Sequence, residues 1–315
     1  MIIRRRPRAP PVFQGSVTMQ ALFIESPLVF IGSVFALALL IGSFLNVVIH
    51  RLPLMIEREW RAQCDDLAAT PAADIPKGRF DLVAPRSRCP SCGHQITAMQ
   101  NIPVISYLVL GGKCAGCGKG ISARYPIIEL LTAFLSGIVA WHFGFGWESA
   151  FAIVLTWALI PISIIDIDHQ YIYDSVVLPL VWLGLVLSLF HPLPGADTLF
   201  IEPRSAIVGA VAGYLSLWSV YHLFRIITGK EGMGYGDFKL LAALGAWLGW
   251  QMLPLIILMS AVVGAVTGIL MIVFRRHERS TPIPFGPYLA AAGWIAMLWG
   301  RDIVNWYLDF MGATG

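Results

Sequence analysis

Residues 149–168 read SAFAIVLTWALIPISIIDID, and this stretch indicates the fold class of the whole chain. No charged side chain occurs from Ser149 to Ile165, and Asp166 and Asp168 follow immediately. An apolar run of nearly 20 residues is typical of a helix that crosses a bilayer. The stretch therefore predicts a membrane-spanning helix with two carboxylates at its end.

Similar apolar runs occur along most of the chain. With the first, they give eight candidate spans, at 27–49, 125–142, 149–165, 175–191, 206–226, 238–250, 254–274 and 286–308. The run at 238–250 is short for a span and could continue into 254–274 across Pro254. We expect an all-α polytopic membrane protein with about eight transmembrane helices.

The composition excludes a water-soluble globular protein. Hydrophobic residues make up 57% of the chain and charged residues 13%, with a mean hydropathy of +0.71. Soluble domains carry about 25% charged residues because water-facing surfaces need them. Disorder, a collagen-like fibre and a small disulfide scaffold are excluded by the same composition. We expect the lipid bilayer, and no nucleic acid, as a partner. The net charge of +3 does not bear on partners, because without residues 1–18, which contain four arginines and no acidic residue, the total would be −1 (18 Lys and Arg against 19 Asp and Glu).

One polar segment, residues 50–124, interrupts the apolar runs. It contains 10 of the Lys and Arg residues, 6 acidic residues and all five cysteines. We therefore divide the chain into an N-terminal arm (1–26), a first transmembrane helix (27–49), this polar domain (50–124) and a transmembrane domain (125–315).

The distribution of basic residues predicts the orientation. With eight spans, the loops near 166–174, 225–237 and 275–285 lie on the side of the polar domain and include Arg225, Lys230, Arg275, Arg276 and Arg279. The loops on the opposite side contain only Arg204. Since cytoplasmic loops are enriched in Lys and Arg, the polar domain is predicted to be cytoplasmic.

The N-terminal arm does not follow this distribution. Four arginines, Arg4, Arg5, Arg6 and Arg8, would lie outside the cytoplasm. Met19 precedes the first span and is an alternative start, in which case residues 1–18 belong to an over-extended reading frame.

Four of the cysteines have the spacing of a metal site. Cys89 and Cys92 form one CxxC pair, and Cys114 and Cys117 form the second. Two such turns supply four thiolates to one tetrahedral ion, and this pattern predicts a structural zinc site of the zinc-ribbon type. Two disulfides are the alternative, although cytoplasmic thiols stay reduced. His94 could compete as a ligand, and Cys64 is left over as an ordinary thiol.

Two groups of acidic residues lie at predicted ends of spans. Asp166, Asp168 and Asp174 follow one apolar run, and Asp237 ends the glycine-rich stretch GMGYGD before another. Carboxylates at membrane depth are costly and usually functional. Two that meet from separate helices cannot both ionise easily, so one holds a proton and the other acts as a base. Such a pair activates water for attack on a peptide bond.

A structural role remains open for each of these aspartates. Any of them could cap the start of an interfacial helix, an interpretation that suits Asp168 and Asp174 better than Asp166 and Asp237. The glycines at 232, 234 and 236 allow a tight bend or a close approach before Asp237. His169 and Lys239 flank the carboxylates and could tune their pKa values.

Five blocks in this order resemble the prepilin leader peptidases, also called type IV prepilin peptidase/N-methyltransferases. They are Gly42–Pro53 (GSFLNVVIHRLP), Cys89–His94 with Asn101–Tyr107, Cys114–Cys117 with Ile121–Pro126, Asp166–Asp174, and Gly232–Lys239. Only residues 1–26, the stretch 65–85 and the final span have little of this signature.

The resemblance implies a GxGD-type aspartic protease of the bacterial inner membrane. In that family the first aspartate of the Asp-x-Asp segment and the aspartate that closes the glycine-rich motif are catalytic, which correspond to Asp166 and Asp237. The implied substrates are precursors of type IV pilins and of type II secretion pseudopilins, cut on the cytoplasmic side. Many members also methylate the new N-terminus with S-adenosylmethionine, but no glycine-rich methyltransferase motif identifies the residues that bind it.

The alternative function is a proton- or ion-coupled transporter with a zinc-ribbon regulatory loop. Transporters also use intramembrane carboxylates to relay protons. A relay needs acidic groups distributed across the membrane, whereas the predicted topology places these at one face.

Overall fold

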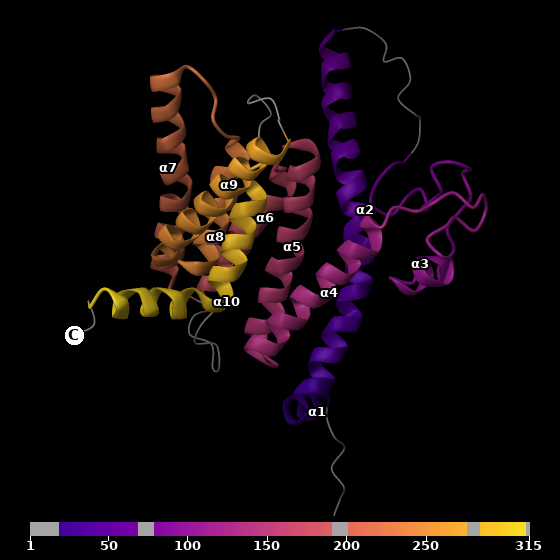
Figure 1. Ribbon diagram of the computed structural model, residues 1–315, viewed down its shortest axis with the longest axis horizontal. Helices are drawn as coiled ribbons and strands as arrows, with labels where there is room; N and C mark the ends of the chain where they lie inside the picture. Colours follow the sequence, from indigo (N-terminus) through magenta and orange to yellow (C-terminus); the bar gives the residue numbers. More distant parts are fainter. Residues whose placement is uncertain (1–18, 69–78, 191–200, 276–283, 313–315) are drawn as a thin grey trace, which may run out of the picture.

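The computed structural model describes residues 19–68, 79–190, 201–275 and 284–312, and this part of the chain is helical, with no β-strand. Ten α-helices occur in it: α1 (Met19–Glu25), α2 (Pro27–Ala68), α3 (Ile105–Val109), α4 (Arg124–Phe143), α5 (Trp147–His169), α6 (Asp174–Ser188), α7 (Pro203–Thr228), α8 (Tyr235–Leu248), α9 (Leu253–Arg275) and α10 (Gly286–Phe310). The predicted all-α fold is confirmed (Figure 1). The arginine-rich arm lies outside the described residues.

Each of the eight predicted spans corresponds to a helix, but the helices differ in length and polarity. Five of those described are long and apolar enough to cross a membrane: Pro27–Cys64, Arg124–Phe143, Trp147–His169, Pro203–Thr228 and Trp250–Met271. Helix α6 is apolar but shorter, and α8 has only 14 residues. Helix α10 bends, and its C-terminal part lies across the direction of the other helices (Figure 1).

One helix boundary differs from the sequence-based expectation, and one alternative that the sequence left open is decided. Helix α2 does not end near residue 49 but continues through Pro53 to Ala68, so it enters the polar segment as one element of 42 residues. Helices α8 and α9 are not continuous across Pro254. Gly249 takes a φ of +85°, a left-handed conformation that glycine adopts readily, and a 3₁₀ turn at Trp250–Met252 follows it.

Glycines let two pairs of helices pack backbone to backbone. A Cβ on Gly42 of α2 would lie 2.7 Å from the Cα atom of Glu129 in α4. On α7, a Cβ on Gly209 would lie 2.2 Å from the carbonyl oxygen of Gly245 in α8. Small residues at such crossings allow helices to associate in a bilayer, where van der Waals contact replaces the hydrophobic effect.

Tryptophan N–H groups add hydrogen bonds between helices. Trp157 on α5 donates to the hydroxyl of Ser136 on α4 at 2.9 Å. Trp294 on α10 donates to the Thr156 hydroxyl at 3.1 Å, and Trp247 on α8 donates to the Leu180 carbonyl at 2.8 Å. These bonds link α4 to α5, α5 to α10, and α6 to α8. Each bond gives an indole N–H group inside the helical body a hydrogen-bond acceptor.

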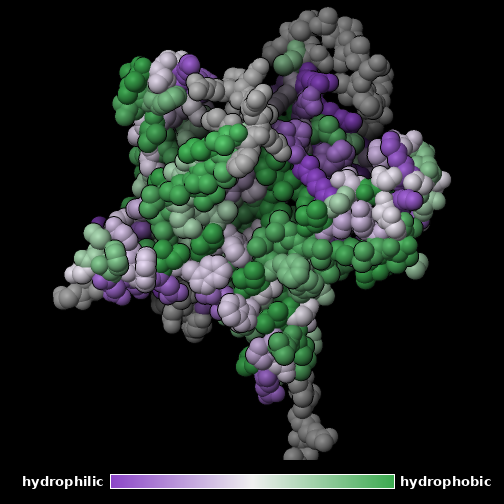
Figure 2. All heavy atoms as spheres, in the orientation of Figure 1, coloured by the Kyte–Doolittle hydropathy of each residue, from purple (hydrophilic) through white to green (hydrophobic). Residues whose placement is uncertain are grey.

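The outer surface is consistent with a bilayer environment. Apolar side chains cover much of the helical body in Figure 2, and hydrophilic ones gather on the upper half of α2 and around the cysteine-containing segment. Exposed side chains on α7 and α9 include Ile207, Val211, Leu223, Leu258 and Ile269. In water such a surface would be an aggregation hazard, whereas in lipid it is the expected exterior.

The part of α2 beyond residue 49 holds the segment that precedes the cysteines. The buried guanidinium of Arg51 donates to the backbone carbonyls of Asp81 and Pro85 at 2.8 and 2.6 Å. Arg58 stacks its guanidinium over the Phe80 ring, 3.9 Å from the centroid, in a cation–π contact. The polar segment is therefore attached to the first long helix directly.

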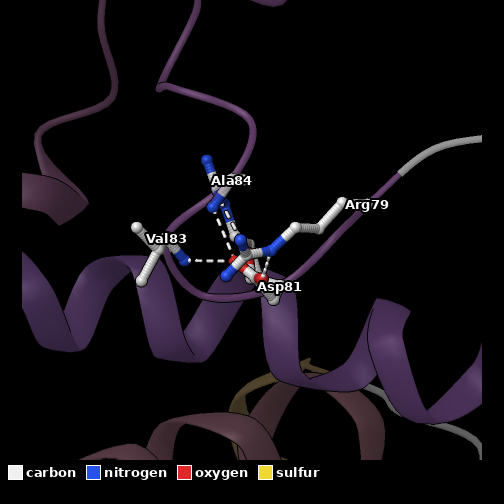
Figure 3. Close-up of polar contacts among 5 residues, drawn as sticks. Arg79, Asp81, Val83 and Ala84 are labelled. Atoms are coloured by element: carbon white, nitrogen blue, oxygen red, sulfur yellow. Dashed lines mark hydrogen bonds and ion pairs between the residues drawn. The ribbon is translucent and has the colours of Figure 1, made fainter.

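A tight turn forms at this attachment. The Asp81 carboxylate accepts hydrogen bonds from the amides of Val83 and Ala84 at 2.8 and 2.6 Å, and it pairs with Arg79 (Figure 3). The Ala84 amide, the Arg79 guanidinium and the Val83 amide together lower the pKa of Asp81 from 3.8 to about 2. The ionised carboxylate is the form that organises the turn.

We expect Gly209→Ala to lower the free energy of unfolding by about 1–3 kcal/mol, because the new Cβ forces α7 away from α8. The measurement is unfolding by SDS titration of the purified protein. Gly32→Ala on α2 is the matched control, since a Cβ there meets nothing within 4 Å. A Gly209→Ala protein as stable as the wild type would show that the two backbones do not touch.

The Asp81 turn is expected to loosen only in strong acid. Because the folded-state pKa is lowered, the stabilisation is present above about pH 3.8 and is lost as the pH falls through about 2. Hydrogen exchange of the Val83 and Ala84 amides, corrected for the intrinsic rate, should show constant protection from pH 7 to 4 and a decline below. In Asp81→Asn the protection should be lower and independent of pH over that range.

Candidate active site and metal centre

Asp166 lies in the last turn of α5 with its side chain buried. Its exposed fraction is 6%, which does not fit a surface residue that caps a helix. The backbone amide of Gly286, the first residue of α10, donates to Oδ2 of Asp166 at 3.0 Å. The carboxyl group is thus held between the end of one helix and the start of another.

Asp237 lies in the first turn of α8 and is buried to the same degree, with 6% of its surface exposed. Within the described part of the chain its Oδ1 atom has no hydrogen-bond partner. Ile172 joins the two positions, because it packs against Gly236, the neighbour of Asp237, and against Gly286, whose amide binds Asp166. The charge of Asp166 also acts on Asp237. Two side chains 71 positions apart are therefore brought into one buried site, as their separate spans predicted.

Ile172, from the loop between α5 and α6, fills the space beside the pair. A Cβ on Gly236, next to Asp237, would lie 2.6 Å from the Cβ of Ile172. A Cβ on Gly286 would lie 2.9 Å from Cδ1 of Ile172 and 2.6 Å from Oδ2 of Asp166. Gly236 is therefore needed because its backbone lies very close to Ile172. Its φ is not one of the positive values that favour glycine, which occur at other positions in the chain.

The other two aspartates are exposed and paired with cations. Asp168 forms an ion pair with Arg124, the first residue of α4. Asp174, the first residue of α6, accepts two hydrogen bonds from Nζ of Lys239 at 2.6 and 2.8 Å. The structure thus separates Asp168 and Asp174 from the buried pair. It directs Lys239 to Asp174, which weakens the suggestion that this lysine tunes the pair.

Two residues at the site have no charge and were not identified from the sequence. Gly286 contributes its backbone amide, and Ile172 contributes its bulk. The dipeptide Gly286-Pro287 was a usable signal, because proline is common in the first turn of a helix and therefore marks where α10 begins. The contact between the Gly286 amide, the first of α10, and Asp166 depends on how α5 and α10 pack.

The four predicted cysteine ligands converge. The Sγ atoms of Cys89 and Cys117 are 3.9 Å apart, as are those of Cys92 and Cys114, and all four lie within 4.8 Å of one another. A tetrahedral site with Zn–S bonds of about 2.3 Å has S···S edges of roughly 3.8 Å. A disulfide would need about 2.0 Å, so this geometry fits a metal site and does not fit two disulfides.

Each cysteine pair lies on the same kind of turn. The amide of Gly93 donates to the Cys89 carbonyl and that of Gly118 to the Cys114 carbonyl, both at 2.9 Å. Both glycines take positive φ, +71° and +69°, a conformation that glycine adopts readily and that such tight turns need. The amides of Ser91 and Cys92 lower the pKa of the Cys89 thiol, whereas burial and the three neighbouring thiols raise the pKa of Cys92, because adjacent thiolates repel one another unless a cation lies between them.

The remaining candidate ligands lie outside the cluster. The cluster of four contains neither His94 nor Cys64. His94 packs its side chain against Gly116, and Cys64 is exposed on the extension of α2.

Contacts join the cysteine domain to the helix ends that hold the carboxyl pair. Glu129 on α4 is buried and accepts a hydrogen bond from the Val104 amide at 2.8 Å. Val104 lies between the two cysteine pairs in the sequence. Trp60 on the extension of α2 contacts the ring of Tyr171, with centroids 5.5 Å apart. Since Tyr171 follows α5 closely, the polar domain and Asp166 lie at the same end of the helical body.

The fold and the two sites together define a class of protein. A polytopic helical body brings two buried carboxyl groups together from different helices, next to a domain with a four-thiol cluster. The pair of carboxyl groups is the arrangement that aspartic proteases use.

The chain belongs to the type IV leader peptidase family. The model of that family matches residues 153–269, which contain both buried aspartates. The model described as Bacterial Peptidase A24 N-terminal domain matches residues 36–143, which contain all four clustered cysteines.

Named relatives cover almost the whole chain. A prepilin leader peptidase/N-methyltransferase of Stutzerimonas stutzeri is 56% identical over 287 residues, 91% of this chain and 96% of the relative. Relatives of the same name from Pseudomonas aeruginosa and Aeromonas hydrophila are 55% identical over 287 residues (91% and 96%) and 54% identical over 282 residues (90% and 95%). No solved structure matches the chain. The resemblance drawn from the sequence is confirmed, and the transporter alternative finds no support.

Proposed function

We propose that the protein cleaves the leader peptides of type IV prepilins and type II secretion pseudopilins, and that it then N-methylates the new terminus. The observation that carries the proposal is the meeting of Asp166 and Asp237 in one buried site. Membership of the leader peptidase family supplies the substrate class, and the name of the relatives includes both activities. The protein acts as a multi-pass enzyme of the bacterial inner membrane, with both sites facing the cytoplasm.

The chemistry follows from two carboxyl groups that share one proton. The ionised group takes a proton from water while the water oxygen bonds to the carbonyl carbon, and the protonated group gives its proton to the carbonyl oxygen. When the C–N bond breaks, the first group returns its proton to the leaving nitrogen. The second group takes a proton from the tetrahedral intermediate, so both groups end as they began.

The burial of the pair suits this reaction. A low-polarity surrounding strengthens every electrostatic interaction at the site and limits competing water. The pilin precursor presents its scissile bond from a helix that enters from the bilayer, so the site needs to lie at a membrane end. The carboxyl pair is in the last turn of α5 and the first turn of α8, as this requires.

Residues 50–124 form the proposed cytoplasmic zinc domain, and residues 125–315 form the aspartic protease domain. The thiolates of Cys89, Cys92, Cys114 and Cys117 would hold Zn²⁺ and complete its four coordination positions, so the ion supports the fold without taking part in cleavage. This domain serves the S-adenosylmethionine-dependent methylation. The hydrogen bonds of Arg51 on α2 and Glu129 on α4 with this segment support a position beside the peptidase domain.

The transporter alternative requires carboxylates distributed through the membrane. In the described residues, the buried acidic groups other than the pair are Glu129 and Glu148. Glu129 binds the backbone of the cysteine domain, and Glu148 begins α5 at the end opposite to Asp166. These positions do not form a continuous relay, whereas the pair itself suits hydrolysis.

Asp166→Asn and Asp237→Asn are each expected to slow cleavage of a purified prepilin by about 10²–10⁴-fold, because an amide neither takes nor supplies the proton. The rate is measured on protein whose thermal unfolding matches the wild type. Asp168→Asn is the matched control, since that carboxylate is exposed and paired with Arg124, and it should retain most of the activity. Full activity in either variant of the buried pair would refute the catalytic assignment.

The double variant Cys89→Ser with Cys92→Ser should release the metal and impair methylation more than cleavage. Elemental analysis is expected to give about one zinc ion per chain for the wild type and close to none for the double variant. Cys64→Ser is the control, because this thiol lies outside the cluster. An unchanged zinc content in the double variant would rule out the four-cysteine site.

A further inference from the structure

The two carboxyl groups of the pair have unlike surroundings. Oδ2 of Asp166 accepts a hydrogen bond from the Gly286 amide at 3.0 Å, whereas Oδ1 of Asp237 is buried without a partner in the described residues. The backbone amide of Gly234 interacts with Asp237 but leaves that oxygen unsatisfied. The charged side chains next to the pair in sequence are directed elsewhere, Asp168 to Arg124 and Asp174 to Lys239.

The amide that reaches Asp166 belongs to the start of a long helix. Helix α10 has 25 residues and begins at Gly286, so the first amides of the helix point outward and are without partners inside it. The partial positive charge at such an end favours a nearby anion. An N–H donor also favours the ionised carboxylate over the neutral acid. Both effects act on Asp166. Asp237 also lies in the first turn of a helix, α8, but its Oδ1 atom receives no donor among the described residues, so its ionised form is less well stabilised by hydrogen bonds.

We propose that the Gly286 amide positions Asp166 and keeps it ionised, so that Asp166 is the general base and Asp237 carries the proton. This assignment rests on the proposed function of the pair. Asp166 takes the proton of the attacking water and later gives it to the leaving nitrogen. Asp237 donates its proton from the unpartnered side to the substrate carbonyl oxygen and recovers one when the intermediate collapses.

Glycine is required at position 286 for this contact. Any side chain would place a Cβ 2.6 Å from Oδ2 of Asp166, closer than carbon and oxygen can approach. The same Cβ would meet Ile172 at 2.9 Å. A larger residue would therefore push the carboxylate off the amide. Gly286 is a positioning residue, since it acts on the reaction through Asp166.

The test is the pH dependence of kcat/KM for cleavage of a purified prepilin by the full-length protein. Its acid limb reports ionisation of the base in the free enzyme. In Gly286→Ala the weakened hydrogen bond should move that limb to higher pH by about one unit, the size expected for a bond to a charged group. His169, which is close to Asp166, is present in every variant and does not change the comparison.

A second variant separates the hydrogen bond from the side-chain clash. Nonsense suppression can replace the Gly286 amide by an ester, which removes the N–H group and adds no atom beside Asp166. It should give the same shift of the acid limb. Gly300→Ala is the matched control on the same helix, because its Cβ meets the flexible end of Met252, and its profile should follow the wild type.

Wild-type profiles in both Gly286 variants would overturn the proposal. A shift of the basic limb in place of the acid limb would also overturn it, because the amide would then act on the proton-carrying group. These outcomes are distinct from failure of the proposed function, which would appear as full activity of Asp166→Asn or Asp237→Asn in the same assay. A shifted acid limb in both Gly286 variants, with Gly300→Ala unchanged, supports the assignment.

Discussion

The structure depends on holding two carboxyl groups together that electrostatics would drive apart. Asp166 and Asp237 come from different helices, and each is buried where an unpaired charge is costly. Three segments meet at this point: the end of α5, the first turn of α8 and the first residue of α10. The energy that keeps the carboxyl groups close therefore comes from helix packing elsewhere in the membrane body.

That packing is built from small residues and from tryptophan hydrogen bonds. Gly209 and Gly245 let α7 and α8 touch through their backbones, which fixes the position of α8 and thus of Asp237. Trp294 ties α10 to Thr156 of α5, the helix that carries Asp166. In a bilayer these contacts are the main source of specificity, because lipid is as apolar as the side chains it replaces.

The fold class and the chemical residues could be predicted from the sequence. A scarcity of charge indicated the membrane, the cysteine spacing indicated a four-thiol site, and acidic residues at the ends of apolar runs indicated the pair. The continuation of α2 to Ala68 could not be predicted, and the sequence left open whether the runs at 238–250 and 254–274 form one helix, because helix limits depend on tertiary contacts that override local preference. The role of the Gly286 amide could not be predicted either, because no side-chain pattern reveals it.

The length of α2 has a mechanical consequence. At 1.5 Å per residue, its 42 residues span about 63 Å, roughly twice the hydrocarbon thickness of a bilayer. One part of the helix is fixed to α4 through Gly42 and Asn46, and the next turns carry the polar domain through Arg51. The helix thus sets the angular position of the cysteine cluster around the bundle of helices. A single residue inserted between Asn46 and Arg51 would rotate that cluster by about 100°, away from the end of α5 that carries Asp166.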